Sequence, residues 1–252
     1  METQDHLAAL RRVGDLLAAA AEAGDLEAHI PACPDWRMRD LLQHMGDVHR
    51  WAAAHVAERR AEPIRRVEGL AGPLPEDTEL LAWFRRGHAS LVATLEAADP
   101  DTECWSFLPA PSPLAFWCRR QAHETGIHRA DAQSPSGDIT PFEPRFAEDG
   151  IEELLFGFFG RPAQDGELQT PPATLCLRAT DRDASWFVRI DAGGVRTERR
   201  EGDADCSVAG TASDLHLLLW NRRSPEGLDV RGDDQVLKHW REHAQIHWSR
   251  SR

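Results

Sequence analysis

The sequence predicts two domains, a bundle of four long α-helices followed by a smaller α+β domain. Three observations predict this fold class. Apolar residues in the first part of the chain recur every three or four positions over segments of about 20 residues, which is the spacing of amphipathic helices. A stretch rich in proline and glycine follows, and beyond it apolar and polar residues alternate as in strands. We therefore expect a helix bundle at 1–160, a linker at 161–172 and an α+β domain at 173–252.

The first three helices are defined by their apolar positions and by the turns between them. The first begins at Thr3 and runs to about residue 21, with apolar positions at Leu7, Leu10, Val13, Leu17 and Ala20. The second follows a turn punctuated by two prolines at 30–36 and runs from Met38 to about residue 60. The third follows a loop rich in proline and glycine, with Asp77 or Thr78 as its N-cap.

The fourth helix is expected from Leu114 to about Ala132. Ser112 is a suitable N-cap for it, and Pro113 suits its first turn. A fifth helix at 144–159 is expected to close the bundle. Bundles of this kind hold metal and cofactor sites between facing helices, so the inner faces of these helices are where chemistry is expected.

The second domain is predicted from short segments with a period of two. Strands are expected at 173–180, 186–191, 195–199 and 205–210, with a hairpin turn at 191–194. A helix at 211–220 and a terminal helix at 233–248 complete an α+β domain.

Composition and charge exclude several classes of function. The chain has 252 residues, more than the ~100–150 that are typical of one domain. It carries 42 acidic and 29 basic side chains, a net charge of −13 that opposes phosphate contacts and predicts no nucleic-acid partner. Hydrophobic residues make up 41% and charged residues 28%, a balance that suits a globular protein rather than a disordered one.

The chain is expected to be cytoplasmic and without a membrane partner. It has no run of about 20 apolar residues, and its N-terminal segment carries acids and arginines where a signal peptide has an apolar run. The cysteines are widely spaced and form no CxxC pair, so we expect them to be reduced and to play no part as metal ligands. They are Cys33, Cys104, Cys118, Cys176 and Cys206.

The fourth helix carries the residues that indicate chemistry. His123 and His128 are five positions apart, or about 140° around a helix, so they cannot bind one ion as the two histidines of an HExxH protease do. Glu124 and His128 are four positions apart and share one face. On the second helix His44 lies on the same face as Leu41, which predicts that it points inward, and His49 is expected to be exposed.

A third ligand from a second helix would complete a metal site. Catalytic zinc sites commonly use three protein groups, often two imidazoles and one carboxylate, and leave one position open. His44, Glu124 and His128 are such a set. The spacing alone also fits a histidine that is satisfied in the core and a Glu–His pair on the surface.

Three segments of the chain resemble a known enzyme family. The string CPDW at 33–36, the string LLQHM at 41–45 and the string HETGIHRADA at 123–132 resemble the mycothiol-dependent maleylpyruvate isomerase family, which belongs to the DinB-like metal-binding bundles. The segment from Val208 to Arg223, with 228–233, is similar to that family's C-terminal α+β domain, which is related to sterol-carrier folds. The resemblance covers nearly the whole chain.

The resemblance implies a metal centre, a thiol cosubstrate and an enzyme. It assigns His44, Glu124 and His128 as ligands of a divalent metal, usually Zn²⁺, and Arg222 or Arg223 as a catalytic arginine. The implied activity is that of a mycothiol-dependent isomerase or thiol S-transferase that adds the thiol to a small electrophile. The identity of the electrophile, the choice between isomer and thioether, and the oligomeric state stay open.

Two other functions remain as alternatives. The same fold can serve as a non-catalytic module that binds a small molecule or a partner, or as a hydrolase in which a metal ion activates water. His239, His243 and His247 form a second histidine stripe on the terminal helix. We expect that stripe to be solvated or to face a domain, because Trp240 and Trp248 offer the packing face.

Overall fold

The structure is a computed structural model that describes residues 1–64, 72–160, 172–191, 193–244 and 246. The chain divides into two compact units, Met1–Thr140 and Pro141–Arg252. Each unit is described by itself below. The first is helical and the second is built on a sheet, so the predicted fold class is confirmed.

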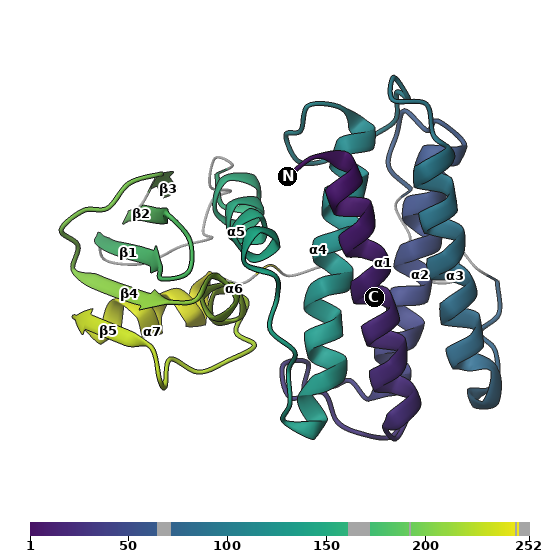
Figure 1. The fold of residues 1–252 in the computed structure, drawn as a ribbon, viewed down its shortest axis with the longest axis horizontal. Coiled ribbons are helices and arrows are strands. Elements are labelled where there is room, and N and C mark those ends of the chain that lie inside the picture. The colour runs from purple at the N-terminus through teal and green to yellow at the C-terminus, as the bar shows by residue number, and fades with distance from the viewer. Residues whose placement is uncertain (65–71, 161–171, 192, 245, 247–252) are drawn as a thin grey trace. The chain divides into compact units, whose positions relative to one another are not determined.

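The first unit is a bundle of four long helices (Figure 1). α1 packs along α4, α2 packs along α3, and α2 also touches α4. A short 3-10 turn, η1 (Ser134–Ser136), follows the last helix. The four helices are α1 (Thr3–Ala23), α2 (Met38–Ala57), α3 (Asp77–Ala97) and α4 (Pro113–Gln133).

Local capping explains where these helices begin. The hydroxyl of Ser112 accepts a hydrogen bond from the Ala115 amide at 3.2 Å, and Pro113 occupies the first turn of α4, as predicted. At the start of α2 the Arg37 amide donates to the Asp40 carboxylate at 2.8 Å. The N-cap of α3 is Glu76, one position before the first residue proposed for that role.

The turn before α2 fixes the position of a tryptophan. The Ile30 amide donates to the Trp36 carbonyl at 3.0 Å, and the Trp36 amide donates to the Cys33 carbonyl at 2.8 Å. These bonds close the segment that carries Pro31 and Pro34 into a tight loop. Trp36 lies two residues before α2, and its partly buried ring contacts that of His44 on the helix, with centroids 4.8 Å apart.

α4 is buried around most of its circumference, unlike the other three helices of the bundle. Two guanidinium groups, those of Arg120 and Arg129, are among its buried side chains, with 2% and 1% exposure. Burial of a charge is costly unless the group is paired, so these arginines require fixed partners on the same helix or close to it. Arg129 meets this requirement with Gln133 and the Thr140 carbonyl.

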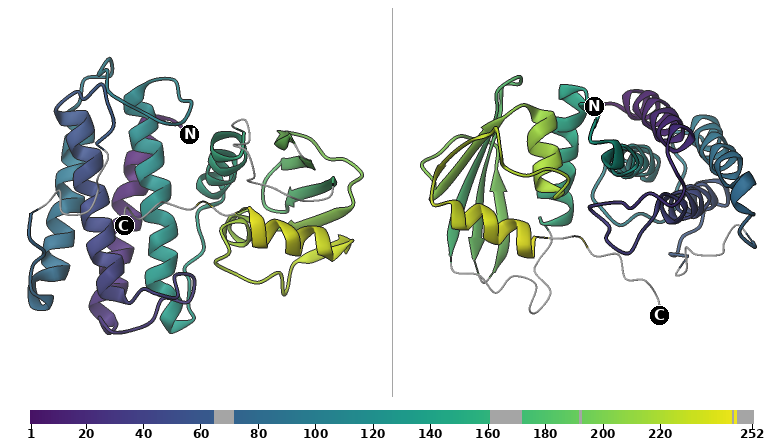
Figure 2. Two further views of the ribbon diagram at one scale, coloured as in Figure 1. Left: turned by 180° about the vertical axis from the view of Figure 1, so that it is seen from behind. Right: turned by 90° about the horizontal axis from the view of Figure 1, so that it is seen from below.

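The second unit is a mixed sheet with helices (Figure 2). Its five strands have the order β3-β2-β1-β4-β5, in which β1 and β4 are parallel and the other neighbours are antiparallel. The strands are β1 (Ala173–Ala179), β2 (Ala184–Asp191), β3 (Gly194–Glu198), β4 (Cys206–Gly210) and β5 (Asp229–Gly232). The helices are α5 (Pro144–Glu152), the π-helical turn η2 (Glu153–Phe158), α6 (Ala212–Leu219) and α7 (Asp234–His243).

One face of the sheet forms the core of this unit. Leu175 lies opposite Val188 and Leu177 opposite Trp186 across the β1–β2 ladder, and all four side chains are almost fully buried. α6 and α7 both contact β1 and β4. Alternation along the strands places Arg178 on the other face, where it is exposed.

The domain boundary differs from the predicted one. The fifth helix, α5, was expected to close the bundle, but it belongs to the second unit, where it packs on α6. A hydrogen bond of 2.8 Å from the Phe142 amide to the Ser213 hydroxyl fixes the start of this segment to α6. The predicted boundaries at 160 and 173 are therefore replaced by one at 140–141, and the predicted linker lies outside the described residues except for Pro172.

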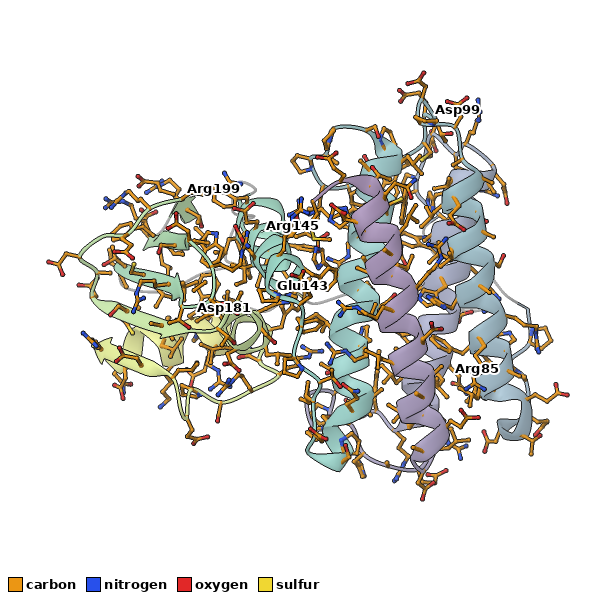
Figure 3. The ribbon with its side chains drawn as sticks, viewed as in Figure 1. Arg85, Asp99, Glu143, Arg145, Asp181 and Arg199 are labelled. Carbon is orange, nitrogen blue, oxygen red and sulfur yellow. The ribbon has the colours of Figure 1, made fainter. Side chains whose placement is uncertain are left out.

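Other details of the second unit also depart from prediction. The edge strand β5 was not predicted, because four residues with one apolar side chain give no alternation to recognise. α7 ends at His243 with Ala244 as its C-cap, so the predicted continuation is wrong at 244 and 246, whereas 245, 247 and 248 lie outside the described residues. Glu143, labelled in Figure 3, caps α5 by accepting a hydrogen bond from the Phe146 amide at 2.9 Å. Nη2 of Arg199 donates a hydrogen bond of 2.9 Å to the carboxylate of Glu152.

Among the described helices none combines the length and apolar character that a bilayer crossing requires.

Candidate metal centre

Three ligand-type side chains from two helices meet inside the bundle. His44 comes from α2, and Glu124 and His128 come from successive turns of α4. Each offers one donor atom, and these donor atoms all lie within 4.8 Å of one another. Glu124 and His128 are buried, whereas the His44 side chain keeps 26% of its surface exposed. The His44 side chain is therefore the most exposed of the three, although its Nε2 is itself buried.

Both imidazoles approach the same oxygen of Glu124. Nε2 of His44 lies 3.6 Å from Oε1 of Glu124, and Nε2 of His128 lies 3.4 Å from that same atom. The two rings meet edge to face with centroids 5.1 Å apart. Two nitrogen donors and one oxygen donor are thus aimed at a common volume.

The other oxygen of Glu124 is held by a buried arginine. Nη2 of Arg120, one turn earlier on α4, donates to Oε2 of Glu124 at 2.8 Å. Burial opposes ionisation of this carboxyl group. The neighbouring imidazoles of His128 and His44, together with the charge of Arg120, outweigh burial and hold the pKa of Glu124 well below its usual range. Glu124 is therefore a carboxylate at neutral pH.

His128 is oriented by a second carboxylate. Its Nδ1 donates to Oδ2 of Asp131 at 2.9 Å, and Asp131 is fully buried. Burial lowers the pKa of His128, but the bonds to Asp131 and Glu124 outweigh that effect and raise the pKa to about 9 in the metal-free protein. An imidazole bonded to a carboxylate through one nitrogen and facing a ligand site with the other is the usual arrangement of a metal-bound histidine.

Trp36 forms the wall of the site. Its ring centroid lies 4.8 Å from that of His44 and 5.9 Å from that of His128, nearly parallel to the latter. Burial is the main cause that lowers the pKa of His44, against the opposing effect of Glu124. His44 is therefore predominantly neutral, which leaves a nitrogen lone pair available for a metal ion.

The expectation for His49 was wrong. His49 is fully buried, and its Nε2 lies 2.9 Å from the hydroxyl of Thr125 on α4. Its ring centroid is 5.4 Å from that of His88 on α3. α2 is enclosed by α3 on one side and α4 on another, so a residue 140° away from His44 still faces protein.

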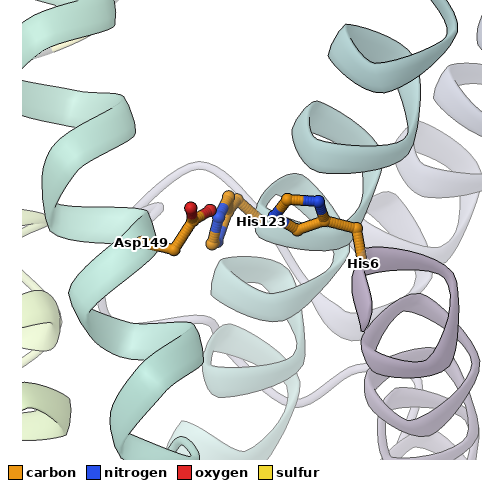
Figure 4. A group of neighbouring side chains, drawn as sticks. All are labelled: His6, His123 and Asp149. Atoms are coloured by element: carbon orange, nitrogen blue, oxygen red, sulfur yellow. The ribbon is translucent and has the colours of Figure 1, made fainter. Parts of the chain in front are cut away.

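His123 faces another part of the bundle, as its spacing from His128 predicts. It meets His6 of α1 edge to face with ring centroids 6.0 Å apart (Figure 4). His6 and His123 are both buried. Asp149, drawn in the same figure, belongs to α5 of the second unit. His123 is thus turned away from the group formed by His44, Glu124 and His128.

Arg222 and Arg223 make contacts within the second unit. Arg222 donates to the Trp220 carbonyl at 2.8 Å. Arg223 pairs with the carboxylate of Asp214 and donates to the Glu226 carbonyl at 2.8 Å. Both arginines follow α6 directly and are partly exposed.

The histidine stripe on α7 is only partly described. His239 and His243 stack with centroids 4.0 Å apart, and Glu242 lies close enough to join them as a donor. Glu242 and His243 are exposed, and His247 lies outside the described residues. This group is therefore more exposed than the one on α2 and α4.

Sequence reasoning missed the two residues that hold the α4 ligands. Arg120 is four positions before Glu124, and Asp131 is three positions after His128. Both spacings place the partners on neighbouring helical turns, so the pattern Arg-x3-Glu-x3-His-x2-Asp contained the signal. Trp36 was quoted as part of a motif but was given no role.

Comparisons with known proteins agree with this architecture. The family model for the mycothiol maleylpyruvate isomerase N-terminal domain matches residues 6–133, and the model for the C-terminal domain of the same family matches residues 145–239. No curated protein sequence matches the chain.

Two crystal structures of a mycothiol-dependent maleylpyruvate isomerase share the fold. One is a histidine-to-alanine mutant, with a TM-score of 0.62, and the other is not described as a mutant and has a TM-score of 0.60. Each is 13% identical to this chain, and each alignment covers 91% of this chain and 93% of the other. With one family model spanning the helix bundle and a second spanning most of the sheet unit, the chain belongs to the mycothiol maleylpyruvate isomerase family of enzymes.

Proposed function

We propose that the chain binds one divalent metal ion, with Zn²⁺ as the first candidate, and uses it to activate mycothiol for addition to a small electrophile. His44, Glu124 and His128 would be the ligands. The observation that carries the proposal is that donor atoms of these three residues, from two helices, lie close together, with the Nε2 atoms of both histidines near Oε1 of Glu124. Family membership supports the thiol as mycothiol and the outcome as isomerisation or S-transfer.

The donor set fits such an ion. Two imidazoles and one carboxylate are a frequent ligand set of catalytic zinc and leave a fourth position for a further ligand. Within the described residues, Nε2 of His44 is buried yet has no hydrogen-bond partner, since its distance of 3.6 Å to Glu124 exceeds a hydrogen bond. A buried nitrogen lone pair without a partner is costly in a protein that binds nothing there, and a metal ion would satisfy it.

The chain's own residues prepare the site for a thiol. Glu124 is ionised, and Asp131 fixes His128 so that Nε2 faces His44 and Glu124. The ring of Trp36 packs against that of His44 and gives the group an apolar neighbour. A bound dication would supply the positive charge that ionises a thiol near neutral pH, well below its usual pKa of ~8.5.

The protein's own cysteines are not needed as nucleophiles in this proposal. Cys118 is fully buried on α4, and burial raises the pKa of its thiol to about 12. Such a thiol is protonated and inaccessible at neutral pH. The reacting sulfur is therefore assigned to the cosubstrate.

Arg222 or Arg223 would bind a carboxylate on the electrophile. A guanidinium group binds a carboxylate in a two-pronged geometry that lysine cannot reproduce. Arg223 is already paired with the carboxylate of Asp214. Substituting each arginine by Lys in turn, and measuring KM for an electrophile with and without a carboxylate, separates the two.

The proposal is tested by following the thiol. Purified protein is incubated with mycothiol and maleylpyruvate, the substrate named in the structural relatives, and then with other conjugated acids. Liquid chromatography that separates an isomerised acid from the substrate, with mycothiol unconsumed, or mass spectrometry that detects a thioether with mycothiol consumed, supports the proposal, provided that the reaction stops without thiol.

Two results would support the alternatives instead. Hydrolysis that proceeds without mycothiol would indicate a metal-dependent hydrolase. Binding of mycothiol or an acid with no chemical change, by a protein that contains no metal, would indicate a binding module.

A further inference from the structure

We infer that Arg120 and Asp131 are positioning residues for the two ligands on α4. Each leaves one donor atom of its ligand available, and their opposite charges change the affinity for a metal ion in opposite directions. This inference rests on the proposed function, because it concerns the same site. It goes beyond it by assigning roles to two residues that are not themselves ligands. Both are on α4, at the outer ends of the ligand pair Glu124 and His128.

Arg120 restricts Glu124 to one available oxygen. Its guanidinium is 2% exposed and donates to Oε2 at 2.8 Å, while Oε1 is the atom that both imidazoles approach. A carboxylate can offer two oxygens to a cation, but an oxygen that accepts a charge-assisted bond from arginine is committed. Glu124 is therefore prepared to act as a one-oxygen ligand, which keeps the number of protein donors at three.

Asp131 restricts His128 to one available nitrogen. The bond from Nδ1 to Oδ2 is 2.9 Å long, and the Asp131 side chain is fully buried. The carboxylate accepts a hydrogen bond from Nδ1 and so turns Nε2 toward Glu124 and His44, where it would give up its proton to a metal ion. Partners of this kind fix the ring and raise the basicity of the ligand, and their loss typically costs 10–100-fold in metal affinity.

The two residues differ in the sign of their charge. Asp131 adds a negative charge beside the donors, which attracts a dication, whereas Arg120 adds a positive charge, which repels it. If both residues were only structural, removing either would weaken the site in the same direction. As positioning residues they predict different outcomes: Asp131→Asn weakens metal binding, and Arg120→Met preserves or strengthens binding but changes the coordination.

The experiment measures Co²⁺ binding by the full chain, because the absorption spectrum of Co²⁺ reports its coordination number independently of activity. We expect wild type to bind one Co²⁺ with the intense visible bands of a four-coordinate ion. Asp131→Asn should keep that spectrum and lose 10–100-fold in affinity. Arg120→Met should bind Co²⁺ with weaker bands, because the released oxygen of Glu124 joins the coordination, and Arg120→Lys should restore the wild-type spectrum.

Matched surface variants control for unspecific effects. Asp15→Asn on α1 and Arg85→Met on α3, where Arg85 pairs with Glu22 in an exposed ion pair, change the same side chains away from the site. They should leave affinity and spectrum unchanged. The melting temperature with and without Co²⁺ checks folding. A variant whose melting temperature is lower, but which the ion raises by as much as it raises that of wild type, has lost stability and kept its site.

The outcomes separate this inference from the function on which it rests. If wild type binds no Co²⁺, the metal centre itself is contradicted, and the positioning roles fall with it. If wild type binds Co²⁺ while Asp131→Asn retains full affinity, or Arg120→Met retains the full spectrum, the corresponding positioning role is overturned and the metal centre stands.

Discussion

Nε2 of His44 lies 3.6 Å from Oε1 of Glu124, and this approach joins α2 to α4 inside the bundle. Neither residue packs there as an apolar side chain would. His44 is partly exposed, whereas Glu124 is buried and charged. Within the described residues the buried Nε2 of His44 has no hydrogen-bond partner, which costs stability, so its position beside Glu124 is better explained by function than by folding.

Acid should destabilise the first unit through its buried imidazoles. Burial is the main cause that lowers the pKa of His49 and of His88, and the two rings also face each other. The groups around His49 are His44, His88, Arg50 and Glu124. Near pH 6.5 the unfolded chain therefore binds protons at His49 and His88 that the folded chain does not bind, so the stability that these two imidazoles contribute is fully present above that pH and is lost below it. His128, whose pKa is raised, acts in the opposite direction, so the effect of His49 is measured as a difference between variants.

Urea unfolding at pH 7.5, 6.5 and 5.5 in the presence of a chelator measures this effect. Each imidazole contributes a slope of at most ~1.4 kcal/mol per pH unit. His49→Gln should reduce the slope below pH 6.5, and the exposed control His243→Gln should leave it unchanged. A slope that is the same in wild type and His49→Gln would contradict the assignment.

Gly46→Ala should destabilise the bundle although alanine is the better helix former. Propensity favours alanine by ~1 kcal/mol in the middle of a helix. A Cβ at Gly46 would lie 1.9 Å from Cζ3 of Trp83 on α3, so the ring or the helix must move. Overpacking of this kind costs roughly 1–3 kcal/mol and exceeds the gain.

The measurement is the free energy of unfolding of Gly46→Ala and of a control variant with the opposite exchange, from alanine to glycine. Ala19→Gly, at an exposed position of α1, should lose ~1 kcal/mol from propensity alone. Gly46→Ala should be destabilised as well. A more stable Gly46→Ala protein would show that α2 and α3 are not packed as closely as described.

Removal of the α4 cap should weaken the helix that carries Glu124 and His128. The Ser112 hydroxyl satisfies the Ala115 amide, and its loss in Ser112→Ala should cost about 0.5–2 kcal/mol. Ser136→Ala changes an exposed serine hydroxyl outside any long helix and serves as the control. Equal unfolding free energies for wild type and Ser112→Ala would refute a capping role.

Cys118 should resist alkylation in the folded protein. Its thiol is fully buried, and burial raises its pKa to about 12, so both access and thiolate formation are suppressed. Iodoacetamide followed by mass spectrometry should leave Cys118 unmodified at pH 7.5 and modify it after unfolding in urea. Rapid native labelling of Cys118, or loss of thiol-dependent turnover in Cys118→Ala with normal metal content, would reopen the question of a protein nucleophile.

Most of the fold could be predicted from local signals. The apolar spacing located α1 to α4, and the Ser112-Pro113 pair located the start of α4, because caps and periodicity depend on neighbours in sequence. The domain boundary was misplaced since α5 has the same periodicity whether it packs on the bundle or on α6. Which partner buries an amphipathic helix is a tertiary fact that its own sequence does not contain.

The candidate site could be predicted in part for the same reason. Helical geometry placed Glu124 and His128 on one face and His44 on the inward face of the second helix, and the resemblance implied the same three residues. The error at His49 arose because a two-sided environment buries residues at unrelated angles, whereas the prediction assumed one inward face. The roles inferred for Arg120 and Asp131 required distances, since an exposed pair at the same spacing contributes little.

The most direct test of the account is the metal content of the purified protein, measured by elemental analysis in wild type, His44→Ala, Glu124→Gln and His128→Ala, with His243→Ala as the control. The account predicts one divalent ion per chain in wild type and in His243→Ala, and its loss in each of the other three variants while they remain folded. A folded wild type that cannot be loaded with any divalent ion, or a His44→Ala protein that retains the full complement, would contradict it.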